Sequence, residues 1–213
     1  MYKLYSMRRS GNCYKVRLAL AQLDIPHELI EIDILQGETR TPEFLKMNPS
    51  GHVPLLEVTP GRYIAESNAI LWYIAGHTPL FTDDRADRAE MLQWMFFEQH
   101  SLEPNLGAAY FWLALVRGGR ELQQHALEDW MQEGYRALGV MEKHLATRRF
   151  FAADRYSIAD IHLFRLYWRV VNAPAPRPRG LARLDALYAR MMARPAVQRT
   201  IEMEKSIGYE LPA

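Results

Sequence analysis

The sequence predicts an α/β domain followed by a longer all-helical domain. In the first third of the chain, short β-prone runs alternate with helical patterns in the order β-α-β-α-β-β-α. After Gly76 strand patterns stop, and the remaining segments show helical spacing of their apolar residues. We therefore expect domains at residues 1–77 and 86–213, joined by a proline- and aspartate-containing linker at residues 78–85.

Length and composition narrow the class of protein. The chain has 213 residues, 49% of them hydrophobic, and 26 Lys and Arg against 25 Asp and Glu. Near-zero net charge argues against a nucleic-acid partner, because such proteins usually carry a basic excess. Cys13 is the single cysteine, which excludes an internal disulfide and cysteine-based zinc sites.

Targeting and membrane signals are also lacking in the sequence. The longest apolar stretch, at residues 108–116, is shorter than the roughly 20 residues that a bilayer span needs. The first residues carry no apolar run of the secretory type. We expect a cytoplasmic protein with no membrane association and no bound metal.

Local patterns define the elements of the first domain. Val16, Leu20 and Leu23 share one helical face, and the alternation from Ile30 onward indicates a strand. Proline at the first position after Thr41 is typical of a helix start. The predicted strands are residues 2–5, 29–34, 53–58 and 62–65, the last two joined by a hairpin turn, and the predicted helices are residues 11–23, a short one from residue 42, and 67–75.

The second domain reads as a series of helices. The predicted helices are residues 88–117, 121–145, 157–171, 181–193 and 196–205. Pro104 should kink the first of them. The helix at residues 157–171 is apolar nearly all round, which predicts that it is buried. Alternating prolines at residues 173–179 predict a loop.

The run Ser10-Gly11-Asn12-Cys13 lies between the first strand and the first helix. A hydroxyl, an amide and the backbone N–H groups of a helix N-terminus can together stabilise an anion. Capping of the helix is the other role open to Ser10 and Asn12. Cys13 either packs as a small apolar side chain or takes part in redox chemistry.

Three further motifs follow. The run Asn48-Pro-Ser-Gly-His-Val-Pro54 precedes a predicted strand, and Glu66-Ser67 opens a predicted helix whose free N–H groups favour an anion. Ser157 and Asp160 form a capping-box pattern at the start of the predicted buried helix.

With these motifs in this order, the chain resembles the cytosolic glutathione S-transferase family, of a bacterial, Ser/Asn-activated type similar to the nu class. The resemblance covers essentially the whole chain. It implies a thioredoxin-like first domain and a helical-bundle second domain. It also implies glutathione as co-substrate, no tightly bound cofactor, and a homodimer.

The resemblance also implies roles for individual residues. Glutathione would be bound by His52, Val53, Pro54, Glu66 and Ser67, with a cis bond between Val53 and Pro54. Its thiolate would be stabilised by Ser10 or Asn12. Tyr110 is a candidate for lining an acceptor pocket, and Cys13 for a redox role.

The implied activity is detoxifying transfer: the glutathione thiolate attacks a small electrophilic molecule. Two alternatives stay open at this point. One is a glutathione-dependent disulfide reductase or peroxidase on the same scaffold. The other is a non-catalytic binding protein that keeps only the fold.

Overall fold

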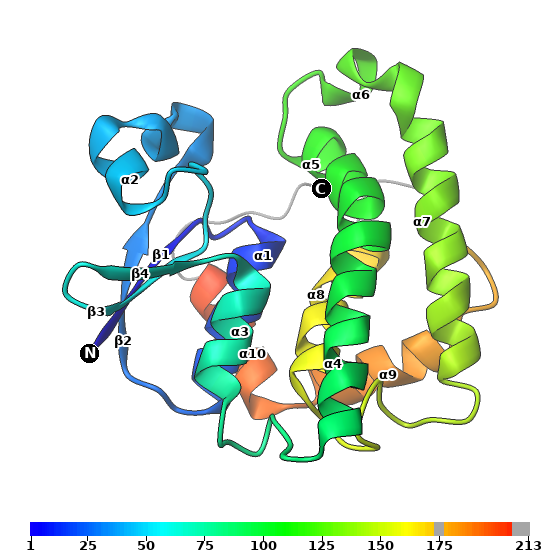
Figure 1. The fold of residues 1–213 in the computed structure, drawn as a ribbon. Helices are drawn as coiled ribbons and strands as arrows, with labels where there is room; N and C mark the ends of the chain where they lie inside the picture. The colour runs from blue at the N-terminus through cyan, green and yellow to red at the C-terminus, as the bar shows by residue number, and fades with distance from the viewer. Residues whose placement is uncertain (173–176, 206–213) are drawn as a thin grey trace. The chain divides into compact units, whose positions relative to one another are not determined.

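The computed structural model describes residues 1–172 and 177–205, and its contacts divide the chain into two units (Figure 1). The first unit contains residues 1–78 and the C-terminal helix α10 (Pro195–Lys205); the second contains residues 79–194. The predicted second domain, residues 86–213, includes α10, whereas the contacts of the structure group α10 with residues 1–78. The physical reason is that α10 packs on helix α1, with ion pairs from Glu204 to Arg17 and from Arg199 to Asp24.

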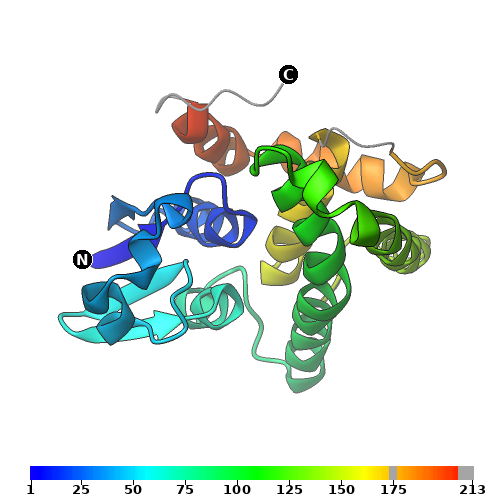
Figure 2. The same ribbon diagram turned by 90° about the horizontal axis from the view of Figure 1, so that it is seen from above.

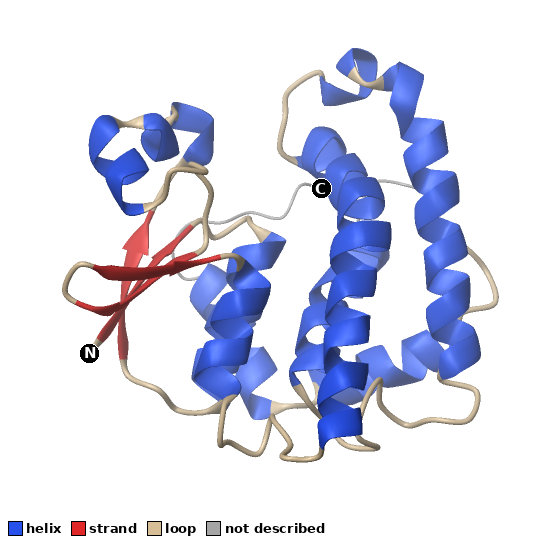
Figure 3. Ribbon diagram, viewed as in Figure 1, coloured by secondary structure: helices blue, strands red, loops and turns tan. Residues whose placement is uncertain are grey.

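The first unit is built on one mixed sheet, with strand order β2-β1-β3-β4 (Figure 3). Its strands are β1 (Tyr2–Ser6), β2 (His27–Glu31), β3 (Leu55–Thr59) and β4 (Arg62–Ala65). Strand β1 runs parallel to β2 and antiparallel to β3. The helices of this unit are α1 (Gly11–Gln22), α2 (Pro42–Met47), α3 (Ser67–Ala75) and α10. Figure 2 shows α1 and α3 side by side against the sheet.

The predicted element order is confirmed, with shifts in two strands: β3, predicted at residues 53–58, is Leu55–Thr59, and β2 is also displaced. The alternation of Ile30, Ile32 and Ile34 predicted a strand at residues 29–34, but β2 begins at His27 and ends at Glu31. Ile34 instead opens a 3₁₀ turn, because the Asp33 side chain accepts the N–H of Leu35 at 2.9 Å. Thr41 caps α2 as expected by accepting the N–H of Phe44 at 3.2 Å.

The second unit is helical throughout its regular structure in the described residues. Its elements are α4 (Arg85–Phe97), a π-helical segment (Glu98–Gly107), α5 (Ala108–Ala114), α6 (Gly119–Leu122), α7 (Gln124–His144), α8 (Ile158–Asn172) and α9 (Ala182–Met192). The kink expected at Pro104 takes the form of the wider π-helical turns, which accommodate a residue that has no N–H to donate. The predicted loop at residues 173–179 lies partly outside the described residues. Within the part of the chain that is described, no helix is long and apolar enough to span a bilayer.

Helix α8 is the centre of the second unit, as its apolar sequence predicted. Every side chain from Ile158 to Val170 is buried. The capping box that starts it is confirmed: Asp160 accepts the N–H of Ser157 at 2.9 Å, and the Ser157 hydroxyl accepts the N–H of Ala159 at 3.3 Å. Charged groups are buried with it, and Arg169 pairs with Glu103 at 3.2 Å.

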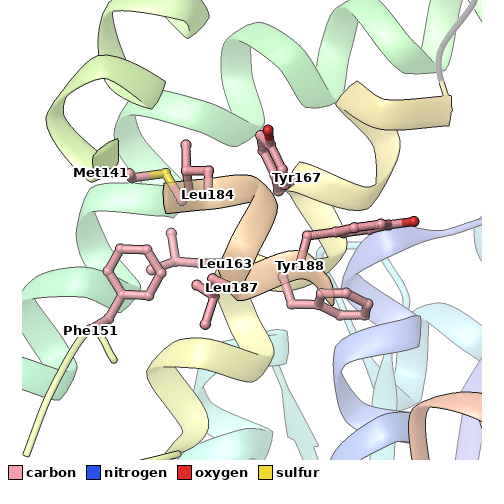
Figure 4. A pocket seen from close by; sticks show the side chains of 8 residues that line it. Met141, Phe151, Leu163, Tyr167, Leu184, Leu187 and Tyr188 are labelled. Atoms are coloured by element: carbon pink, nitrogen blue, oxygen red, sulfur yellow. The ribbon is translucent and has the colours of Figure 1, made fainter. Parts of the chain in front are cut away.

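A small pocket among α7, α8 and α9 belongs to this core (Figure 4). Its walls are apolar and aromatic side chains that point toward one another: Met141, Phe151, Leu163, Phe164, Tyr167, Leu184, Leu187 and Tyr188. The polar tip of Tyr167 is engaged by Asp185, to which it donates at 2.8 Å. We therefore interpret the pocket as a small gap in the packing of the helical unit.

Two glycines of α7 offer a matched test of this packing. A Cβ added at Gly134 would overlap the Leu106 side chain of the π-helical segment, whereas one added at Gly139 would meet nothing within 4 Å. We expect Gly134→Ala to lower the free energy of unfolding by about 1–3 kcal/mol through overpacking. Gly139→Ala should raise it by about 0.5–1 kcal/mol, because alanine favours a helix. Denaturant titration of both variants checks the pair, and equal effects would contradict this packing.

Candidate functional site

Ser10 is the N-cap of α1. Its side-chain oxygen accepts the N–H of Cys13 at 3.3 Å, and its own N–H donates to the C=O of Met7 at 3.1 Å. Capping uses a lone pair of the hydroxyl and does not consume the O–H hydrogen, which a hydroxyl can rotate toward a ligand. The capping role considered for Ser10 is therefore real, and it is compatible with the anion-stabilising role.

Asn12 connects the first motif to the third. Its side-chain oxygen accepts a hydrogen bond from the Ser67 hydroxyl at 3.4 Å, which brings the N-termini of α1 and α3 together. Ser67 is buried at the first position of α3, while the neighbouring Glu66 is exposed and adopts φ 69°. Two helix N-termini that meet in this way present positive dipole ends to one place.

The loop before β3 is held by one buried amide. Asn48 donates from its side chain to the C=O of His52 at 2.8 Å and accepts from the Ser50 hydroxyl at 2.9 Å. The peptide bond between Val53 and Pro54 is cis, as the resemblance implied. The side chain of His52 is exposed. Among the described residues, no backbone hydrogen bond engages Val53.

The sheet register gathers these segments at one edge. Leu55 lies opposite Tyr5 on β1 and opposite Ala65 on β4. The start of β3, the end of β1 and the end of β4 therefore lie side by side. Each of these ends leads directly into one of the three motifs, so the sheet brings Ser10, Val53 and Glu66 to the same edge of the first unit.

Chemically, this edge combines hydrogen-bond donors, a hydroxyl and two helix N-termini, which suits a small anionic ligand. An exposed carboxylate, that of Glu66, is also present to meet an ammonium group. The described residues include no group of three His, Cys, Asp or Glu side chains placed to hold a metal ion.

Cys13 lies beneath the site. Its side chain is fully buried, and its sulfur accepts the N–H of Met7 at 3.3 Å. Burial raises the pKa of the Cys13 thiol, and the nearby Arg17 only partly opposes that rise. A raised pKa disfavours the thiolate that redox chemistry requires. The structure thus argues against the redox role and favours the alternative, a small packed side chain.

Tyr110 lies on α5 in the second unit. It is only 4% exposed, and the guanidinium of Arg169 lies over its ring at 5.0 Å. A ring covered in this way is a packing group. This burial argues against the expected role of Tyr110 in lining an acceptor pocket.

Two residues that shape the site, Asn48 and Arg17, lie in the predicted motifs but had no role predicted for them. Asn48 follows α2 in an Asn-Pro-Ser run, a pattern typical of a side chain that bonds its own backbone, and this signal could have identified it. No sequence signal predicted the role of Arg17, because an arginine on a helix usually faces solvent. Here it is buried and contacts the loop that leads to Ser10.

Comparison with known proteins shows the family of the chain. The chain matches the family model for the glutathione S-transferase N-terminal domain over residues 1–76 and that for the C-terminal domain over residues 89–195. Glutathione S-transferase 3 of Zea mays is 31% identical over 208 residues, which cover 93% of this chain and 92% of that protein.

Two bacterial proteins extend the comparison. The disulfide-bond oxidoreductase YfcG of Escherichia coli (strain K12) is 30% identical over 209 residues, covering 93% of this chain and 94% of that protein. The crystal structure of a possible glutathione S-transferase from Rhodopseudomonas palustris is 59% identical, with a TM-score of 0.89 over 92% of this chain and 88% of that one. With both domain models matched and relatives of this identity over nearly its whole length, the chain belongs to the glutathione S-transferase family.

Proposed function

We propose that the edge of the sheet in the first unit binds glutathione and stabilises its thiolate for attack on a small electrophilic molecule. The observation that carries this proposal is the convergence of three segments: the N-terminus of α1 at Ser10, the cis Val53–Pro54 loop, and the N-terminus of α3 at Ser67. Membership of the family supports glutathione as the ligand.

Activation of the sulfur is the chemical problem at this site. A thiol with a pKa of about 8.5 is only about 3% ionised at pH 7, and lowering that pKa by two units makes it about 75% thiolate. Such a shift corresponds to about 2.7 kcal/mol of preferential interaction with the anion. We assign this interaction to the Ser10 hydroxyl, the Asn12 amide and the N-terminus of α1.

The remaining groups suit the rest of the tripeptide. The N–H and C=O of Val53, just before the start of β3, pair with the glutathione backbone as a short added strand. Ser67 and the N-terminus of α3 receive the γ-glutamyl carboxylate. Glu66 meets the γ-glutamyl ammonium, and exposed His52 meets the glycyl carboxylate.

The proposed reaction is a displacement or an addition at an electrophilic carbon. Glutathione loses its thiol proton to solvent on binding. The sulfur then forms a bond to carbon, and the leaving group departs with its electron pair, or the electron pair moves onto the acceptor in an addition. Positioning and thiolate stabilisation account for the rate.

Removal of the Ser67 hydroxyl should weaken glutathione binding without slowing the chemical step. Ser67→Ala removes the hydroxyl that donates to Asn12 and that can turn toward a carboxylate at the N-terminus of α3, so we expect the KM for glutathione to rise about tenfold with kcat nearly unchanged. Steady-state kinetics with glutathione as the varied substrate measures both values. A fall in kcat with an unchanged KM would assign Ser67 to the chemical step instead.

Calorimetry tests the proposal as a whole. Glutathione should bind the purified full chain at millimolar concentration or below, and the protein should conjugate it to an aryl halide. Absence of glutathione binding would contradict the proposal, whatever electrophile is chosen.

Glutathione-dependent reduction of disulfides is the second candidate, and the likeness to the Escherichia coli oxidoreductase favours it. Burial of Cys13 and the raised pKa of its thiol point to a reaction that uses two glutathione molecules rather than a protein cysteine. Assaying conjugation, disulfide reduction and peroxide reduction side by side ranks these activities. Retention of disulfide reduction in Cys13→Ser would support the two-glutathione route.

We further propose a cytoplasmic homodimer. The family resemblance is what supports both features. Light scattering on the purified chain tests the dimer, and fractionation of the producing cell tests the location.

A further inference from the structure

The guanidinium of Arg17 lies buried beneath the loop between β1 and α1. It is 4% exposed, and it contacts three consecutive residues, the last of β1 and the first two of that loop. It donates to the Ser6 hydroxyl at 2.5 Å, to the C=O of Met7 at 3.2 Å and to the C=O of Arg8 at 2.9 Å. A planar fork of N–H groups can hold several acceptors in fixed directions, which an ammonium group cannot do.

Glu204 holds the same guanidinium from the other side. Its carboxylate, on the last turn of α10, is 8% exposed and accepts from Arg17, 187 residues away in the sequence. The end of α10 is thereby joined to the first loop of the chain. A second contact of α10, from Arg199 to the C=O of Ala21 at 3.0 Å, anchors it to the opposite end of α1.

One carbonyl connects this ion pair to Ser10. The C=O of Met7 accepts from both the Arg17 guanidinium and the N–H of Ser10. The N–H of Met7 also donates to the sulfur of Cys13. Met7 therefore links the Arg17 guanidinium to the N-cap residue whose hydroxyl faces the ligand in the proposed function.

We propose that Arg17, oriented by Glu204, is a positioning residue that fixes the β1–α1 loop and so aims Ser10 at the glutathione sulfur. This inference rests on the proposed function of that edge. It assigns the C-terminal helix a role in thiolate stabilisation, although α10 contributes no group that touches glutathione. Arg17 acts through the geometry of its hydrogen bonds, because it holds the last residue of β1 and the first two residues of the loop.

Arg17→Lys and Arg17→Met separate geometry from charge. Both substitutions remove the planar set of guanidinium N–H donors, but lysine keeps the positive charge. We expect both variants to raise the pKa of bound glutathione, measured by ultraviolet titration of its thiolate, and to lower kcat about 10- to 100-fold with little change in the KM for glutathione. Glu204→Gln keeps an oxygen acceptor for Arg17 and should give a smaller change in the same direction.

Arg199→Met is the matched control, because it loosens α10 at the far end of α1. It should leave both the thiol pKa and kcat as in the wild type. A wild-type thiol pKa in Arg17→Lys together with a raised one in Arg17→Met would overturn the positioning role in favour of a direct effect of charge. An equal loss in Arg199→Met would reduce the effect to general loosening of α10, which also overturns it.

The outcome can be distinguished from failure of the proposed function. If Ser10→Ala raises the thiol pKa and the Arg17 and Glu204 variants do not, only the present inference fails. If the Arg17 variants do not fold, Glu204→Gln alone tests the positioning role. A thiol pKa in this variant equal to that of the wild type would then contradict the inference. Failure of the wild type to bind glutathione would instead remove the proposed function itself.

Discussion

Ser10→Ala should lower kcat about 100-fold at neutral pH, the usual cost of losing one preorganised donor to a developing or bound anion. The pKa of bound glutathione should rise in the same variant, so that part of the activity returns as the pH increases. Glutathione affinity should change little, because the hydroxyl contacts only the sulfur in the proposed function. A pH–rate profile of kcat, together with titration of the bound thiol, measures these quantities.

The same substitution removes the N-cap of α1, so a control must separate capping from chemistry. Thr41→Ala removes an equivalent cap from α2, where Thr41 accepts the N–H of Phe44 at 3.2 Å. Both variants should lose about 1 kcal/mol of stability, but only Ser10→Ala should lose turnover. A wild-type profile in Ser10→Ala, with the loss appearing in Asn12→Ala, would transfer the role to Asn12.

Asp160→Ala should cause the largest loss of stability. The buried carboxylate accepts three hydrogen bonds: from the N–H of Phe151 at 3.1 Å, and from the N–H and hydroxyl of Ser157 at 2.9 and 3.2 Å. Because an unsatisfied buried donor costs about 1–3 kcal/mol, we expect a loss of about 3–5 kcal/mol. Denaturant titration measures it. Asp84→Ala, at the exposed cap of α4, is the control and should cost about 1 kcal/mol. A loss no larger than that of the control would contradict this view of Asp160.

The contribution of Asp160 to the free energy of unfolding should decrease as the pH rises. Burial raises the pKa of Asp160 to about 7 from its ordinary value of 3.8, and the hydrogen bonds from Phe151 and Ser157 only partly oppose that rise. Between pH 3.8 and about 7, Asp160 is ionised in the unfolded chain but protonated in the folded one, so folding takes up a proton. The stabilisation by Asp160 is therefore fully present below about pH 4 and is lost as the pH rises through about 7. Asp160→Asn does not titrate. The stability advantage of the wild type over this variant should therefore shrink by up to about 1.4 kcal/mol per pH unit across that window. A constant difference would show that the native pKa is not raised.

Features that depend on local spacing were predictable from the sequence. The order of elements in the first unit, the hairpin after Val58 and the buried central helix α8 all follow from apolar periodicity and turn residues. The end of β2 was missed because the cap at Asp33 overrides an apolar alternation. The placement of α10 in the first unit was missed because it depends on pairs such as Arg17–Glu204, which no local pattern encodes.

Some residues of the candidate site were predictable from the sequence and others were not. Ser10, Val53 and Ser67 were identified from short motifs, and their convergence follows from the pairing of β3 with both β1 and β4. The roles considered for Cys13 and Tyr110 depended on exposure, which a motif does not report, and both side chains are buried. Asn48 and Arg17 both hydrogen-bond the backbone of loops. The Asn-Pro-Ser run signals this role for Asn48, whereas for Arg17 only the folded loop shows it.

The pKa of glutathione bound to the wild-type protein tests the central claim most directly. Ultraviolet titration of the complex should place the thiol about two units below the value of about 8.5 for a free thiol. A bound thiol that keeps its ordinary pKa would contradict thiolate stabilisation at the N-terminus of α1.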